Sequence, residues 1–176
     1  MGQVLSHRHF YCSFHVERSE SIFIKTNDIS NYHLSLSHSE NCTIDGNSLQ
    51  RGYGVCGWYS SSISVIRNTI TNNTVEPSIG LYDSTNFTIL ENHISRNDVG
   101  LRLCQSNTNY IFLNNFVNNK QQLELVDSFT NIYDDGYKGN YWSDYNGTDL
   151  DGDGIGDTGI PHQKVDWYPL MGPWTM

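Results

Sequence analysis

Polar and apolar positions recur in the same order through five copies along this chain. Each copy is anchored by an Asn, with a Ser eight residues before it, an aliphatic residue three before it and an apolar residue two after it. The anchors are Asn27, Asn47, Asn68, Asn92 and Asn114, at spacings of 20, 21, 24 and 22 residues. A repeat of this length predicts a solenoid in which each copy forms one coil.

Within each copy, short runs rich in β-branched and aromatic residues have the length and composition of strands. One run precedes the anchor, as in Phe87-Thr88-Ile89-Leu90, and a short one surrounds the apolar residue after the anchor, as at Ile94. A third lies near the end of the copy, as in Leu101-Arg102-Leu103, where inward and outward positions alternate. Three brief strands per copy predict an all-β fold, a parallel β-helix of about five rungs of 20–24 residues.

A leucine-rich repeat is the main alternative, because its period is similar and its strand also ends with apolar residues around an Asn. The copies in this chain favour Ile over Leu, place Ser where that repeat has Leu, and contain no stretch typical of a helix. We therefore favour the parallel β-helix.

Stacking of the coils explains why Asn is the anchor. Neighbouring coils lie about 4.8 Å apart, so each residue sits on its equivalent in the next coil, and stacked like charges would be unfavourable. Asn side chains in a column can instead hydrogen-bond amide to amide, and Asn tolerates the left-handed backbone of a sharp corner. We therefore expect a continuous Asn column along the axis.

The four cysteines are Cys12, Cys42, Cys56 and Cys104. They show no C-x-x-C spacing and allow three disulfide pairings, between which the sequence does not decide. Cys42 and Cys56 fall at apolar positions of the repeat, so we expect both to be buried as small hydrophobic residues.

The repeat divides the chain into three parts. Residues 1–18 are predicted to form a partial or truncated first rung, residues 19–127 the β-helix repeats, and residues 128–176 a C-terminal cap rich in aromatic residues, Gly and Asp. An uncapped first rung would expose strand edges and an apolar layer, so self-association through that rung is expected.

Composition narrows the function classes. Only 16% of residues are charged, but Ile, Val and aromatic residues are frequent enough to predict a folded chain. A net charge of −9, concentrated after Asp134, argues against nucleic acid as a partner. No run reaches the roughly 18 apolar residues of a membrane span, and residues 1–19 lack the apolar core of a signal peptide.

The sharpest chemical motif lies between Asp149 and Asp157. Its carboxylates occupy positions 1, 3, 5 and 9 of an EF-hand-like loop, with Gly at position 6, although Ile160 replaces the Glu of position 12. Such a loop predicts a structural Ca²⁺ site that holds the cap, with a solvated acidic turn as the alternative. The expected ligands are Asp149, Asp151, Asp153, the Ile155 carbonyl and Asp157, with Asp144 or Asp166 as additional candidates.

Three segments of the tail together resemble a known C-terminal signature: Asn140-Tyr141-Trp142-Ser143-Asp144-Tyr145, the Asp loop, and Asp166-Trp167-Tyr168-Pro169-Leu170-Met171. The signature belongs to a large group of archaeal and bacterial surface β-helix proteins. The group is classed with the periplasmic copper-binding protein that assists nitrous oxide reductase and with carbohydrate-binding and sugar-hydrolysis β-helices. The resemblance covers residues 19–171 and implies a right-handed parallel β-helix at an extracellular, cell-surface or periplasmic location. It also implies a role with copper, which maps onto no residue motif of the family in this chain.

Our main functional hypothesis is a non-enzymatic module that binds polysaccharide or another cell-surface partner. Its ligand face would lie on outward strand positions around Tyr82, Asp83, Arg102 and Gln105, because aromatic and amide side chains on a flat sheet suit sugar rings.

Two alternatives remain open. The first is a periplasmic copper-binding accessory protein, with His7, His9, Cys12 and His15 as candidate ligands, because imidazole and thiol groups suit copper. A partly exposed strand that happens to carry histidines explains the same residues more simply. The second is a polysaccharide lyase or hydrolase built on Asp83, Arg102 and Glu124, for which ordinary surface charge is the simpler interpretation.

Overall fold

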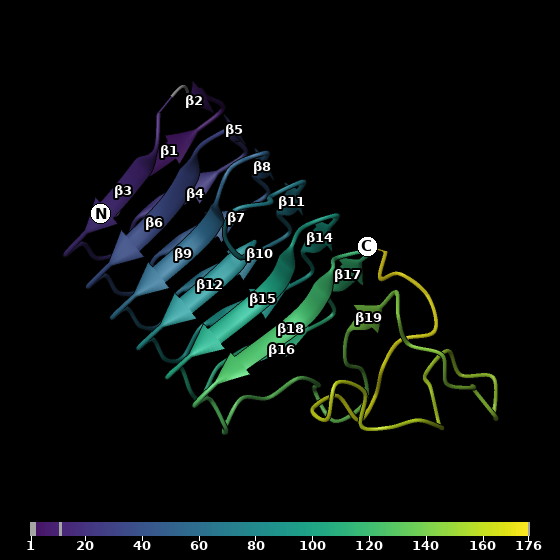
Figure 1. Cartoon of the computed structure of the whole chain (residues 1–176). Coiled ribbons are helices and arrows are strands. Elements are labelled where there is room, and N and C mark those ends of the chain that lie inside the picture. The colour runs from purple at the N-terminus through teal and green to yellow at the C-terminus, as the bar shows by residue number, and fades with distance from the viewer. Residues whose placement is uncertain (1–2, 11, 176) are drawn as a thin grey trace.

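The computed structural model describes residues 3–10 and 12–175, and its strands wind into a parallel solenoid (Figure 1). Each coil contributes one strand to each of three parallel sheets, here called sheets A, B and C. Sheet A contains β1 (Val4–Ser6), β4 (Phe23–Lys25), β7 (Thr43–Asp45), β10 (Ser64–Ile66), β13 (Thr88–Leu90) and β16 (Tyr110–Phe112). Sheet B contains β2 (His9–Phe10), β5 (Asp28–Ser30), β8 (Ser48–Gln50), β11 (Thr69–Thr71), β14 (His93–Ser95), β17 (Asn115–Val117) and β19 (Tyr141–Trp142). Sheet C contains β3 (Phe14–Glu17), β6 (His33–Ser37), β9 (Gly54–Trp58), β12 (Ile79–Tyr82), β15 (Val99–Cys104) and β18 (Gln121–Val126).

The prediction of an all-β parallel solenoid is confirmed, and the leucine-rich repeat is wrong, since the described residues contain no helix. The solenoid has about six coils rather than about five, because β1, β2 and β3 add one strand to each sheet ahead of the first anchor copy. In the part of the chain that the structure describes, we find no helix of the length and hydrophobicity needed to cross a membrane.

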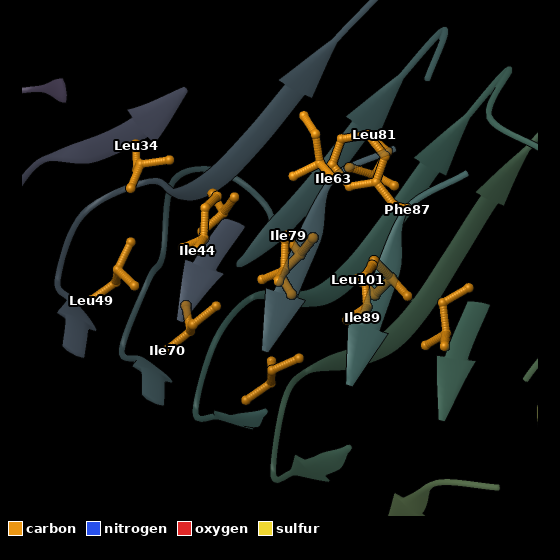
Figure 2. Close-up of a cluster of buried hydrophobic side chains, with 14 of the residues drawn as sticks. Leu34, Ile44, Leu49, Ile63, Ile70, Ile79, Leu81, Phe87, Ile89 and Leu101 are labelled. Atoms are coloured by element: carbon orange, nitrogen blue, oxygen red, sulfur yellow. The ribbon is translucent and has the colours of Figure 1, made fainter. Parts of the chain in front are cut away.

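The core is a set of apolar columns, one from each sheet, that meet inside the coils (Figure 2). In sheet A the column consists of Ile24, Ile44, Val65, Ile89 and Ile111, all with no exposed surface. Equivalent residues pair in register, so each aliphatic side chain packs on the same position of the next coil. Burial of each such side chain contributes about 1.5–3 kcal/mol, which explains why the repeat keeps these positions apolar.

The predicted Asn column is present and runs from Asn27 to the last coil, whereas the first coil has Arg8 at the equivalent position. The Nδ2 atom of each anchor donates to the Oδ1 atom of the next at 2.9–3.0 Å, and the column continues beyond Asn114 to Asn140. The same Oδ1 atoms accept the backbone N–H of the preceding anchor. The column therefore satisfies buried polar groups at the corner between sheets A and B.

The left-handed residue at this corner is not the Asn that we expected. It is the residue before each anchor: Thr26, Gly46, Arg67, Glu91 and Leu113 have φ values of 53° to 63°. The anchors are absent from the positive-φ residues, because their side chains must point into the solenoid to form the column.

The prediction that Cys56 points inward is also wrong, whereas Cys42 is buried as expected. Cys56 pairs with Ser35 on one side and Gly80 on the other, which places it on the outer face of sheet C. Gly57 takes the inward position, where an added Cβ would lie 2.7 Å from the Phe87 ring. A shift of one residue along a strand exchanges the two faces, and here it places a half-buried thiol on the outer side of the sheet.

Beyond β18, the tail folds against the last coil and adds β19 to sheet B. The Trp142 ring stacks on Phe116 with 4.4 Å between ring centroids and covers the apolar column at this end. The Asp loop lies in the same tail, which forms the irregular green and yellow segment in Figure 1.

Candidate functional site

The predicted calcium loop brings three carboxylates together. Oxygen atoms of Asp149, Asp151 and Asp153 lie within 4.8 Å of one another. The Asp149 carboxylate accepts the N–H groups of Gly154 at 2.9 Å and Gly152 at 2.7 Å, and these bonds lower its pKa. An oxygen-only donor set on a tight Gly-containing loop is the arrangement that hard divalent cations prefer.

The remaining predicted ligands of the loop lie in different surroundings. An oxygen of Asp157 accepts the N–H of Leu150 at 2.7 Å, so it closes the base of the loop. Asp144 accepts a bond from Gln163 at 2.9 Å and lies 3.2 Å from Nε2 of His162. Neither residue belongs to the three-carboxylate group that the described residues form.

Asp166 ends the Asn column. One of its oxygens accepts the N–H of Asn140 and the indole N–H of Trp142, both at 2.8 Å, and the other accepts the N–H of Tyr168 at 3.0 Å. Burial raises the pKa of this carboxyl group, although the N–H donors act in the opposite direction. The structure therefore gives Asp166 a clear role in attaching the tail to the last coil.

A hollow of about 430 Å³ lies on the outer face of sheet C. Its lining residues are His15, His33, Ser35, Tyr53, Cys56, Trp58, Glu76 and Tyr82. We call this hollow the sheet C groove. Three small residues in register, Ser35, Cys56 and Gly80, leave room between the larger rings on either side.

Two imidazoles form one wall of the sheet C groove. The rings of His15 and His33 meet edge to face with 4.8 Å between centroids. Nδ1 of His15 lies 2.6 Å from the Ser35 hydroxyl, and Nδ1 of His33 lies 3.0 Å from the Ser13 hydroxyl. Among the described residues, the Nε2 atoms have no hydrogen-bond partner. Burial, followed by the nearby His15, lowers the pKa of His33, which favours its neutral, metal-binding form.

The other walls are aromatic and carry one carboxylate. Trp58 stacks on Tyr82 with 3.9 Å between centroids and an angle of 9°, and Tyr53 meets His33 at 5.6 Å. Glu76 comes from the segment that follows β11. Burial, with a smaller contribution from Glu76, raises the pKa of the Cys56 thiol to about 12, so the thiol stays protonated at neutral pH.

The four predicted copper ligands are spread over the first coil. His9 lies on sheet B, 3.4 Å from Asp28, whereas His15 lies on sheet C, and Cys12 is exposed between them. His7 is exposed and precedes β2 with a φ of 56°. Among the described residues, these side chains do not form a group of three ligand atoms within 4.8 Å.

Sequence reasoning missed His33 as the neighbour of His15. The alternation of inward and outward side chains along the two strands could have indicated it. Val16 and Leu34 point inward, so their neighbours His15 and His33 point outward on the same sheet. The two rings lie diagonally across adjacent strands, a relation that appears only when the coils are stacked.

The predicted carbohydrate face is divided between the sheet and its corner. Tyr82 lines the sheet C groove, and Asp83 and Gln105 are exposed corner residues with φ values of 48° and 49°. Arg102 forms an ion pair with Glu124 at 2.7 Å. That pair engages two of the three residues proposed for lyase or hydrolase chemistry.

The three parallel sheets define the chain as a parallel β-helix, with His15, His33 and Cys56 lining a hollow on the outer face of sheet C. The model of one protein family, described as periplasmic copper-binding protein (NosD), matches residues 2–147. This chain therefore belongs to the NosD family.

Two curated relatives support the assignment, and both are named "Probable ABC transporter binding protein NosD". The relative from Stutzerimonas stutzeri is 32% identical over 163 residues, which cover 78% of this chain and 36% of the relative. The relative from Pseudomonas aeruginosa is 30% identical over 150 residues, which cover 82% of this chain and 33% of the relative. The chain thus spans about a third of the length of these proteins. A solved structure of the fluoroquinolone resistance protein QnrB1 aligns with a TM-score of 0.17 and 10% identity over 69% of this chain and 84% of that chain, values too low to support an argument.

Proposed function

We propose that this chain is a copper-handling accessory module that works in the periplasm. The observation that supports the proposal is membership of the NosD family across residues 2–147. The relatives are named as ABC transporter binding proteins, so the module would act beside a transporter and handle copper as cargo. Of the functions considered from the sequence, this one agrees best with the family.

The donor atoms on the surface fit this cargo. Imidazole groups bind copper well, and the sheet C groove holds His15 and His33. The Asp loop offers only oxygen atoms, which suit Ca²⁺ rather than copper. The two sets of donors lie on different parts of the chain, so their metals can be tested separately.

The test is an anaerobic titration of the full chain with Cu(I) in competition with a coloured Cu(I) chelator. We expect the chain to withdraw copper from the chelator with a fixed stoichiometry, and Ca²⁺ not to displace it. A chain that leaves all the copper on the chelator, at every protein excess tried, would show that this module does not handle copper.

We also propose that the Asp149–Asp157 loop binds Ca²⁺ and holds the tail against the last coil. The converging oxygens of Asp149, Asp151 and Asp153 support this role. Because a cation bound only to the folded loop stabilises the fold, removal of Ca²⁺ should loosen the tail.

Carbohydrate binding is a second candidate function, favoured by the stacked Trp58 and Tyr82 rings on the open face of sheet C. Trp58 is 40% exposed, so a ring face is available to a sugar. Binding on a glycan array that disappears in Trp58→Ala would support this function. Absence of binding above background in the wild-type chain would exclude it for the glycans present.

A further inference from the structure

We propose that Cu(I) binds in the sheet C groove through the Nε2 atoms of His15 and His33, with an open position left for a ligand from the donor or acceptor of the metal. This inference rests on the proposed copper function and assigns it a site. It differs from the ligand set expected from the sequence, because it uses His15 together with a residue of the next coil.

The two imidazoles are close enough to share one ion. A metal–imidazole bond is about 2.0–2.1 Å long, so two nitrogens on one ion lie up to about 4 Å apart. The ring centroids of His15 and His33 lie 4.8 Å apart, and the proposed site requires their Nε2 atoms to converge on one ion. His9, in contrast, lies on another sheet and faces Asp28.

Both imidazoles have a hydroxyl partner at Nδ1. A metal-binding His usually hydrogen-bonds through its other ring nitrogen, which fixes the tautomer and the direction of the ligand atom. The Nδ1 atoms of His15 and His33 make this contact with Ser35 and Ser13, at 2.6 and 3.0 Å. When Nδ1–H donates to the serine hydroxyl, Nε2 carries the lone pair that a metal needs, and neither Nε2 has a hydrogen-bond partner within the described chain.

The surroundings favour the softer, singly charged ion. The rings of Trp58, Tyr82 and Tyr53 line the same hollow, and aromatic faces attract a cation. Two imidazoles supply only half of the square-planar set of nitrogen and oxygen ligands that Cu(II) prefers. We therefore assign the site to Cu(I), and its open position would allow the ion to be passed on.

The experiment compares two double variants of the full chain in the anaerobic Cu(I) competition assay. We expect His15→Ala/His33→Ala to lower the Cu(I) affinity by at least about 100-fold, because both direct ligands are lost. The matched control, His7→Ala/His9→Ala, removes two histidines of the first coil and should stay within about threefold of wild type. Thermal unfolding of each variant without copper checks that the fold is intact.

A second variant tests the orientation of the rings without removing a ligand. Ser13→Ala/Ser35→Ala should lower the affinity by about 10–100-fold, because the rings lose the bonds that fix Nε2 toward the ion. X-ray absorption of the wild-type copper complex should show two imidazole nitrogens at about 2.0 Å.

The outcomes separate the site from the function. If wild type binds Cu(I) and His15→Ala/His33→Ala binds it equally well, this site is wrong and the copper function stands. If wild type binds no Cu(I), the copper function itself fails. A copper complex without histidine nitrogens would also overturn the site.

Discussion

Removal of a single Asn from the buried column should destabilise the solenoid far more than its polarity suggests. Asn92 is the central example, because its side chain is fully buried and makes five hydrogen bonds. Its Oδ1 accepts two bonds from Asn68, and its Nδ2 donates to Val65, Leu90 and Asn114. Asn92→Ala therefore removes bonds to buried partners in both neighbouring coils.

The expected loss follows from the groups that remain unpaired. Each buried polar group without a partner costs about 1–3 kcal/mol, and the Asn68 N–H and the Val65 carbonyl both lose short bonds to this side chain. We expect Asn92→Ala to lower the free energy of unfolding by about 2–5 kcal/mol. Asn92→Asp should be worse at neutral pH, because it places a buried negative oxygen against three acceptor oxygens.

Urea unfolding followed by circular dichroism measures both changes, with Asn146→Ala as the control. Asn146 is an exposed residue of the tail, and its substitution should change stability by no more than about 0.5 kcal/mol. If Asn92→Ala unfolds at the same urea concentration as Asn146→Ala, the column is not a source of stability. An Asn92→Asp variant as stable as wild type would refute the hydrogen-bond directions.

Three further predictions concern the tail and the corners. For the calcium loop, EGTA should lower the thermal midpoint of wild type but not that of Asp151→Ala/Asp153→Ala. The reason is that Ca²⁺ at about 100 times its Kd stabilises the folded form by roughly 2.7 kcal/mol. An unchanged wild-type midpoint, together with no calcium binding by calorimetry, would contradict the site. Thr26 has a φ of 53°, a left-handed conformation that is unfavourable for Thr but not for Gly, and Gly46 occupies the equivalent position in the next coil. Thr26→Gly should therefore raise the free energy of unfolding by up to about 1 kcal/mol. A measured loss of stability would contradict this account of the corner. For Asp166, burial raises the folded-state pKa, so the stability associated with this group is present below the usual carboxyl pKa of 3.8 and is lost as pH rises through the folded value. Wild type should therefore lose stability relative to Asp166→Asn between about pH 4 and about pH 7, as measured by the difference in their free energies of unfolding. A difference that does not change with pH would show that Asp166 does not titrate in this way.

The fold could be predicted because its information is repeated in the sequence. Every coil must place an apolar residue in the same column, so an uncertain assignment in one copy is decided by the equivalent positions in its neighbours. Ile44, for example, pairs with Ile24 on one side and Val65 on the other. The Asn column was predictable for the same reason. Its left-handed neighbour was not, because Thr26, Arg67 and Glu91 share no side-chain property that signals a positive φ.

The sheet C groove could not be derived from single copies of the repeat. Val55-Cys56 presents two consecutive apolar residues, so the sequence does not show which one points inward. The decision depends on the Phe87 ring, which fills the space beside Gly57 and belongs to another copy of the repeat. His15 and His33 likewise become neighbours only across two strands. This candidate site is formed by contacts between residues of different coils, which the pattern within a single copy of the repeat does not show.

The alternation of sheet C separates the chemistry of the groove from the stability of the solenoid. Leu34, Val55 and Ile79 point inward and stack from coil to coil, so changes there alter the core. Ser35 and Cys56 are their immediate neighbours in sequence, yet they point outward and contribute little to that packing. A strand with this geometry can therefore change its surface donors while it keeps its inward column. This independence explains how one solenoid can keep its buried Asn and Ile columns and still present imidazole, thiol and aromatic groups on one outer face.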